Sequence, residues 1–245
     1  MSKRQVTYLG HASTLIELDG VSLLTDPVLR RRTAHLLRVG PLPEVSNPDG
    51  VLISHGHLDH LDLGTLARFP RDTLILVPHG LGTLVRSHGF VQVQEVDQGD
   101  EVAVGAVRVG VTHADHPGRP APGRSRAAVG YVVSGSGTVY FAGDTDIFDG
   151  MASLAPALDV ALIPIWGWGP TIGEGHLDPT RAAQALTLLR PRIAVPIHWG
   201  TLRPFYLSTH SAFLREPLDA FLQAASERAP EVEIRALELG EAVEL

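Results

Sequence analysis

Residues 54–62, with the sequence SHGHLDHLD, constrain this chain more than any other segment, because they place three histidines in the pattern H-x-H-x-D-H. The segment follows the apolar triplet at residues 51–53, which has the composition of a buried strand. His55 and His57 are two residues apart, so in extended backbone their side chains project to the same side and can bind one metal ion. The fold must therefore bring the end of a buried strand to a metal site.

Asp59 and His60 come after the chain has begun to turn, so they can face a second ion, about 3.5–4 Å from the first in two-metal sites. Histidine nitrogens and carboxylate oxygens suit zinc and equally manganese or iron, because these donors are not soft. We therefore expect two divalent ions, with zinc as the first choice. The alternative, a solvated histidine-rich loop, is disfavoured by the spacing and by the further candidate ligands.

Three more candidate ligands stand at the ends of apolar, strand-like runs, namely His116, Asp144 and His198. A rigid scaffold can direct side chains at its strand ends into one cleft. An aspartate between two cations can bridge them, which makes Asp144 the natural shared ligand. His113 competes with His116, because spacing does not separate two residues of one loop. His198 has an alternative role as a core histidine bonded to a backbone carbonyl.

These motifs resemble, in order, those of the metallo-β-lactamase superfamily. The match covers nearly the whole chain and consists of LTDP at 24–27, HGHLDH at 55–60, His116, FAGDT at 141–145 and PIHWG at 196–200. The opening YLGHASTLIELDGVSLLTDP at 8–27 and the segment GHLDPTRAA at 175–183 are most similar to one branch. That branch contains L-ascorbate-6-phosphate lactonase and N-acyl phosphatidylethanolamine-hydrolysing phospholipase D.

The resemblance implies an α/β fold, a four-layer αββα sandwich in which two mixed sheets pack face to face with helices outside. It also implies a dinuclear site with His55, His57 and His116 on the first ion, Asp59, His60 and His198 on the second, and Asp144 between them. Asp26 would support the histidine-rich loop without binding metal. The resemblance favours His116 over His113 as the third ligand of the first ion. The chain has no cysteine, so the thiolate ligand of true β-lactamases is absent and hydrolysis of antibiotics is not expected.

Composition agrees with one globular enzyme domain over residues 1–245, because 44% hydrophobic content over 245 residues can bury a large core. The apolar runs are far shorter than the ~20 residues of a membrane span, and the N-terminus lacks the apolar part of a signal peptide. We therefore expect a cytoplasmic protein without an integral membrane segment. The net charge of −7 argues against nucleic acid as a partner. The expected partner is a small-molecule or lipid-like substrate, and the oligomeric state stays open.

Strands are predicted at 5–9, 14–18, 21–25, 74–77, 102–112, 127–133, 138–142, 160–164 and 193–197, and helices at 63–69, 82–87, 179–189 and 211–229. Asp19 and Gly20 have the composition of a two-residue hairpin turn. Asp178 is a candidate N-cap, followed by proline at the first helical position. The hairpins that end in LLTDP and YFAGDT each place an aspartate at a strand end, which predicts two related halves.

Two adjacent cations lower the pKa of bound water from 15.7 toward ~7, so a hydroxide exists at neutral pH without a dedicated protein base. His176, in the GHLDP segment, is the candidate catalytic residue that helps the leaving group depart, alongside Asp144 at the metals. His11 is a second pocket candidate, and either histidine could instead be structural. Trp166, Trp168 and Trp199 form a pocket wall or pack in ordinary loops.

The segment at residues 28–43 carries Arg30, Arg31, Arg32 and Arg38 among leucines. Arginine forks match phosphate or carboxylate oxygens, so these side chains would suit an anionic substrate. The alternative is a solvated helical face whose leucines pack inward.

The leading hypothesis for the reaction is metal-dependent hydrolysis of an ester, lactone or phosphodiester. Iron-dependent oxidoreductase chemistry is one alternative, although no flavin-binding segment is recognisable for a di-iron reductase. A catalytically inactive metal-binding module is the other, and it is disfavoured because every expected ligand position is filled.

Overall fold

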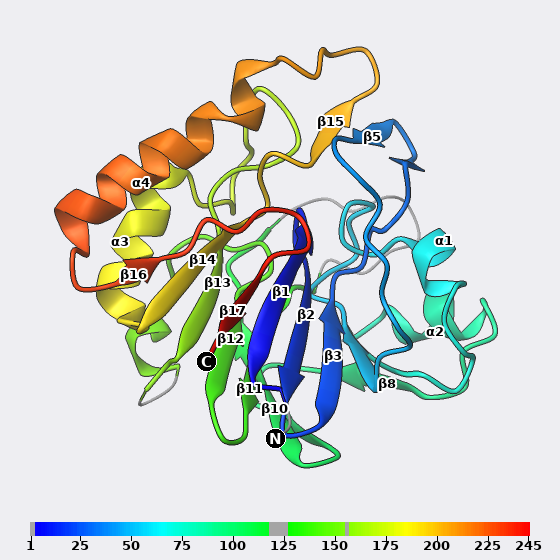
Figure 1. Cartoon of the computed structure of the whole chain (residues 1–245). Helices are drawn as coiled ribbons and strands as arrows, with labels where there is room; N and C mark the ends of the chain where they lie inside the picture. The colour runs from blue at the N-terminus through cyan, green and yellow to red at the C-terminus, as the bar shows by residue number, and fades with distance from the viewer. Residues whose placement is uncertain (1–2, 118–126, 155–156) are drawn as a thin grey trace.

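The computed structural model describes residues 3–117, 127–154 and 157–245, and two seven-stranded mixed sheets lie face to face at its centre (Figure 1). The first sheet has the order β17 (Ala242–Glu244), β1 (Gln5–Gly10), β2 (Ser13–Leu18), β3 (Val21–Thr25), β6 (Gly50–Leu52), β7 (Leu74–Pro78), β8 (Val93–Val96). The second has the order β16 (Glu233–Ile234), β14 (Ile193–Ile197), β13 (Val160–Pro164), β12 (Thr138–Phe141), β11 (Val129–Ser134), β10 (Val107–His113), β9 (Glu101–Val104). In each sheet an antiparallel half continues into a parallel half.

Strand β13 shows why these sheets need cover on both faces. Its sequence is apolar throughout, and successive side chains of a strand point to opposite faces. Val160 and Leu162 accordingly pack into the core between the sheets, whereas Ala161 and Ile163 pack against the helices outside. The same alternation along the neighbouring strands produces one core between the sheets and one on each outer side.

Four α-helices supply the outer layers of the described chain. α3 (Pro179–Leu189) and α4 (Glu216–Arg228) cover the second sheet, and α1 (Leu63–Leu66) and α2 (Gly82–Arg86) cover the first. Short 3₁₀ helices, η1 (Met151–Ser153) and η2 (Ala212–Leu214), precede β13 and α4. The predicted four-layer α/β architecture with two mixed sheets is therefore confirmed. None of the helices described is long and apolar enough to cross a membrane.

Several local predictions are also confirmed. The turn at Asp19 and Gly20 joins β2 to β3, and both residues have positive φ, as the favoured hairpin turns require. The side chain of Asp178 accepts a hydrogen bond from the Arg181 backbone N–H and caps α3, with Pro179 at the start of the helix.

Two local predictions were wrong, and one alternative is excluded. The single strand expected at 102–112 is the hairpin of β9 and β10, which turns at Gly105 with a φ of +54°. The helix expected at 211–229 begins only at Glu216, because Pro217 has no backbone N–H and can stand only in the first turn of an α-helix. The arginine-rich segment is not helical: it forms β4 (Arg32–Thr33) and β5 (Leu36–Arg38), which pair with β15 (Leu202–Pro204) in a small third sheet.

Candidate metal centre

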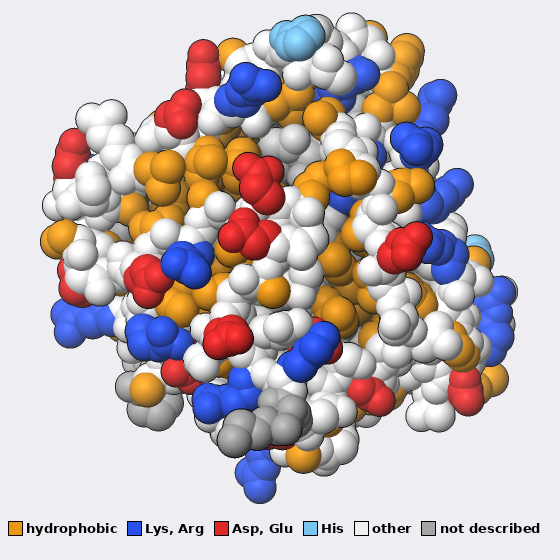
Figure 2. Space-filling view, in the orientation of Figure 1, with side chains coloured by type: hydrophobic (Ala, Val, Ile, Leu, Met, Phe, Trp, Pro, Cys, Tyr) orange, Lys and Arg blue, Asp and Glu red, His pale blue; other side chains and the backbone are white. Residues whose placement is uncertain are grey.

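Six strands of the two large sheets deliver polar side chains to one end of the sandwich. The residues are His11 after β1, Asp26 after β3, His55 after β6, His116 after β10, Asp144 after β12 and His198 after β14. All six are at least nine-tenths buried, and Figure 2 shows little histidine on the face that it presents. Because the strands are fixed in packed sheets, these side chains meet in a rigid setting.

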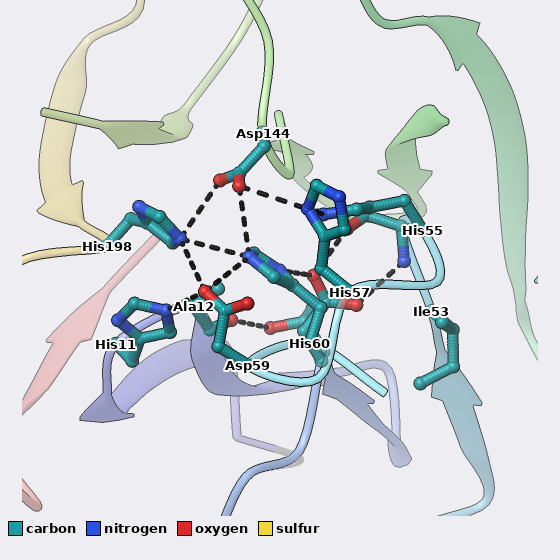
Figure 3. Close-up of polar contacts among 12 residues, drawn as sticks. His11, Ala12, Ile53, His55, His57, Asp59, His60, Asp144 and His198 are labelled. Carbon is teal, nitrogen blue, oxygen red and sulfur yellow. Dashed lines mark hydrogen bonds and ion pairs between the residues drawn. The ribbon is translucent and has the colours of Figure 1, made fainter. Parts of the chain in front are cut away.

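Two groups of four candidate ligands each lie side by side (Figure 3). The first consists of His55, His57, His116 and Asp144, and the second of His11, Asp59, His60 and His198; within each group the candidate ligand atoms lie within 4.8 Å of one another. Asp144 contacts both groups. Its Oδ2 lies 3.7 Å from His55 Nε2 and 3.1 Å from His60 Nε2, and its Oδ1 lies 3.2 Å from His198 Nε2.

The outward-facing nitrogens of two histidines are bonded to backbone carbonyls, which fixes their tautomers. His198 Nδ1 donates to the carbonyl of Trp166 at 2.7 Å, and His116 Nδ1 donates to the carbonyl of Gly175 at 2.8 Å. A carbonyl oxygen only accepts, so the ring proton stands on Nδ1. The Nε2 atoms that face the centre of the site therefore carry lone pairs.

The buried carboxylate of Asp26 fixes two more rings in the same way. It accepts hydrogen bonds from the Ser54 backbone N–H at 2.7 Å, from the Ser54 hydroxyl and from His60 Nδ1 at 2.6 Å. Because the Ser54 hydroxyl donates to Asp26, its oxygen accepts from His55 Nδ1 at 2.9 Å. Asp26 thus orients the histidine-rich loop, and it forms a third close group with His55 and His60. No sequence signal pointed to the relay through Ser54.

The inward nitrogens lie close enough together that a proton or a metal ion must stand between them. His60 Nε2 is 3.0 Å from His198 Nε2, and His57 Nδ1 is 2.9 Å from His55 Nε2 and 3.2 Å from His116 Nε2. Where the outer nitrogens hold the protons of neutral rings, lone pairs face lone pairs at these distances. The buried Oδ1 of Asp144 also has no hydrogen-bond partner among the described residues. Imidazole nitrogens converging on carboxylate oxygens fit zinc, manganese or iron.

The pKa shifts of the cluster residues also indicate that the site favours a positive charge at its centre. Burial lowers the pKa of His60, but the charges of Asp144 and Asp59 outweigh it and hold that pKa well above its ordinary value. Burial and the charge of His60 instead lower the pKa of His55 well below its ordinary value. Burial raises the pKa of Asp144, but His198 and His60 more than reverse this and hold it well below the usual range. The site therefore favours ionised carboxylates around a positive centre.

His176 lies at the edge of the first group. Its Nε2 is 3.3 Å from Asp144 Oδ2, and its Nδ1 donates to the carbonyls of Gly173 and Glu174 at 3.1 and 3.2 Å. Burial lowers the pKa of His176, but the hydrogen bond and charge of Asp144 raise it to about 9. This side chain can therefore hold a proton close to the cluster.

A cavity of about 590 Å³ opens onto the cluster and is lined by His57, Asp59, Asp144, His176 and His198. Its other walls come from His35 and Leu36 and from the loop at residues 167–174. Of the three tryptophans, Trp168 lines this cavity, whereas Trp166 and Trp199 line two other hollows. His35 packs edge-on against Trp168, with ring centroids 5.1 Å apart.

His113 and His116 are placed differently. The exposed ring of His113 ends β10 and packs edge-on against Phe148, with centroids 4.9 Å apart. His116 is buried and contributes to the first group of candidate ligands. The structure thus brings His116 to the cluster and leaves His113 outside it.

The arginine-rich segment does not supply arginine to the described lining of the cavity. Arg38 donates to the backbone carbonyls of Val28 and Pro41 at 3.1 and 3.0 Å, and Arg30 pairs with Asp62 at 3.3 Å. These contacts hold loops together, so they give no support to recognition of an anionic substrate by this segment.

The chain has relatives along its whole length. A family model described as the beta-lactamase superfamily domain matches residues 22–199. A UPF0173 metal-dependent hydrolase from Methanopyrus kandleri is 32% identical over 248 residues, which cover 98% of this chain and 99% of that protein.

Solved structures agree with this relationship. Igni18, a metallo hydrolase from Ignicoccus hospitalis, has a TM-score of 0.73 at 25% identity and covers 98% of this chain and 97% of its own. CmlA, a diiron beta-hydroxylase from Streptomyces venezuelae, has a TM-score of 0.74 at 22% identity. That match covers 99% of this chain and 54% of CmlA and shows a shared fold. From its sequence relatives and its architecture, the chain belongs to the metallo-β-lactamase superfamily.

Proposed function

We propose that this chain is a dinuclear metal-dependent hydrolase that cleaves an ester, lactone or phosphodiester. The observation that carries the proposal is the convergence of inward-facing histidine nitrogens on the buried carboxylates of Asp59 and Asp144. The relatives support it, because the Methanopyrus kandleri protein that matches over nearly the whole chain is named as a metal-dependent hydrolase.

The residues divide naturally between two ions. His55, His57 and His116 would hold the first, and Asp59, His60 and His198 would hold the second. Asp144 would be shared, because its carboxylate lies near His55 of the first set and near His60 and His198 of the second. Bound divalent ions would lower the pKa of water and polarise the bond to be broken. Zinc is the first choice, with manganese and iron compatible with the same donors.

The remaining chemistry belongs to the chain's own side chains. His176 Nε2 faces both the cavity and Asp144, so it can deliver a proton to the departing oxygen of the substrate. Its Nδ1, bonded to two carbonyls, keeps the ring in place during that transfer. Trp168, Leu36 and Ile172 offer apolar wall to the part of the substrate that does not react.

The cavity suits a small molecule or the end of a lipid-like substrate. The likeness of residues 8–27 and 175–183 to the lactonase and phospholipase branch favours a lactone or a phosphodiester within the general class. Trp168 with its partner His35 would then decide which acyl or alcohol group fits.

Iron-dependent oxidation is the second candidate function. It is favoured by a specific observation, the fold shared with CmlA, which is a diiron beta-hydroxylase. The donor set of the present site accepts iron as well as zinc. Hydrolysis takes precedence because the full-length sequence relative carries the hydrolase name.

A substrate screen tests the hydrolase proposal. Chelator-treated protein is reconstituted separately with zinc, manganese or iron and offered phosphodiesters, lactones and N-acyl compounds. We expect turnover of at least one class by a reconstituted sample and none by the metal-free sample. Oxygen consumption by the iron form, with no hydrolysis by any form, would favour the oxidative alternative.

Metal content tests the dinuclear arrangement. We expect about two divalent ions per chain after metal-replete expression, because seven ligands suit two sites better than one tetrahedral site. Asp144→Ala should lose occupancy at both positions, since this carboxylate faces both groups. Elemental analysis that gives one ion or fewer in the wild-type chain would contradict the arrangement.

A pair of variants tests the choice between the two histidines after β10. His116→Ala should abolish activity and weaken the first metal site, because His116 Nε2 faces the cluster. His113→Ala should change both quantities much less, because its ring packs outside against Phe148. The reverse ranking in metal titrations would show that His113 is the ligand.

A variant of His176 distinguishes a role in metal binding from a role in proton transfer. His176→Ala should keep nearly wild-type metal content but lower kcat on any substrate found, by about 10²–10⁴-fold, with KM changed less. Unchanged kcat would remove His176 from the chemical step. Loss of metal in this variant would make it a ligand.

A further inference from the structure

His11 is a buried histidine whose role is not explained by the ligand sets proposed above. It directly follows β1 and adopts a left-handed φ of 57°, a conformation that few residues other than glycine adopt and in which histidine is among the enriched types. Its Nε2 lies 2.8 Å from Asp59 Oδ2, and its ring lies against that of His198 with centroids 4.0 Å apart (Figure 3). His11 therefore touches two of the three side chains assigned to the second ion.

The ring proton of His11 stands on Nε2, whereas those of His198 and His116 stand on Nδ1. His198 and His116 donate outward from Nδ1, but His11 Nδ1 is buried and has no hydrogen-bond partner among the described residues. A buried N–H without an acceptor is rarer and less favourable than a buried lone pair without a donor. The proton consequently stands on Nε2, where it is donated to Asp59.

This tautomer decides between two roles. Distance alone would allow His11 to be a fourth ligand, because its ring lies in the same group as Asp59, His60 and His198. A nitrogen that carries a proton has no lone pair for a metal ion. His11 therefore acts on the ion through Asp59.

Backbone hydrogen bonds of His11 also hold it beside the second group of ligands. Its carbonyl accepts the backbone N–H of His198 at 2.9 Å, and its own N–H donates to the Thr201 hydroxyl at 3.0 Å. His198 also has a left-handed φ, of 62°. The turn after β1 and the turn after β14 are thus joined by the hydrogen bond between His11 and His198. A displacement of either residue would therefore displace the other.

We propose that His11 is a positioning residue that sets the affinity of the second metal site by holding Asp59, without binding the ion itself. The proposal rests on the dinuclear arrangement proposed above and adds a distinction between the sites. Among the described residues, no member of the first group makes a hydrogen bond, ion pair or ring contact with the His11 side chain, so the metal affinity of the first site should be independent of His11. Loss of an outer hydrogen-bond partner of a metal ligand typically lowers metal affinity by about 10–100-fold.

A matched pair of amide variants tests the proposal. Zn²⁺ is titrated calorimetrically into the chelator-treated full chain, and the binding step that disappears in Asp59→Ala identifies the second site. His11→Gln can place an amide N–H near the position of Nε2, whereas the shorter His11→Asn accepts the left-handed backbone but does not reach Asp59. We expect His11→Gln to stay close to wild type and His11→Asn to weaken the second step by about 10–100-fold. The first step should remain unchanged in both variants and report that each is folded.

Control variants complete the test. The exposed-histidine control His210→Asn should bind zinc as wild type does. Equal second-site affinity in His11→Asn and wild type would overturn the inference while leaving the dinuclear proposal standing. A loss in His11→Gln as large as that in His60→Ala would make His11 a ligand and would also overturn it. A wild-type chain with a single binding step would contradict the dinuclear proposal itself, and this inference with it.

Discussion

Nitrogen lone pairs that face one another inside a buried site are the constraint on which the rest of this structure depends. Carbonyls and the Asp26 carboxylate hold one ring proton on the outer side of each histidine, so the inner nitrogens of neutral rings cannot satisfy one another without an added proton or metal ion. A buried polar group without a partner costs about 1–3 kcal/mol. A cation removes this cost at several atoms together, which couples metal binding to the stability of the fold.

The two packed sheets stabilise this unfavourable cluster of buried polar side chains. Each candidate ligand follows a strand end or lies on the loop after β6, and the apolar core between the sheets fixes those ends. Strained backbone gathers at the same place: His11, Asp26 and His198 all have positive φ. Non-glycine residues in that region cost about 1–3 kcal/mol each and persist where the surrounding structure determines them. The stability of the sandwich therefore offsets a site that would be unfavourable alone.

The sequence carried much of this account because metal ligands must be specific residue types at specific spacings. The H-x-H-x-D-H segment and the aspartate and histidines at strand ends are such signals, and the four-layer fold followed from the resemblance that they carry. Elements whose limits depend on one backbone position were harder to predict. Gly105 divides an apparently continuous strand, and Pro217 delays the start of α4.

Features made by the backbone or by tertiary packing left no sequence signal. The carbonyls of Trp166 and Gly175 fix two histidine tautomers, yet any residue type can present a carbonyl. His35 reaches the cavity only because β5 pairs with β15 in the small third sheet. The arginines of that segment looked suited to an anionic substrate, and only the structure shows Arg38 held by carbonyls of neighbouring loops.

Anomalous diffraction from crystals of the zinc-loaded chain, recorded at the zinc absorption edge, tests the central claim most directly. We expect two peaks about 3.5–4 Å apart, the spacing of known two-metal sites. One peak should lie on His55, His57 and His116, and the other on Asp59, His60 and His198, with Asp144 reaching both. A single peak, or a second peak away from these side chains, would contradict it.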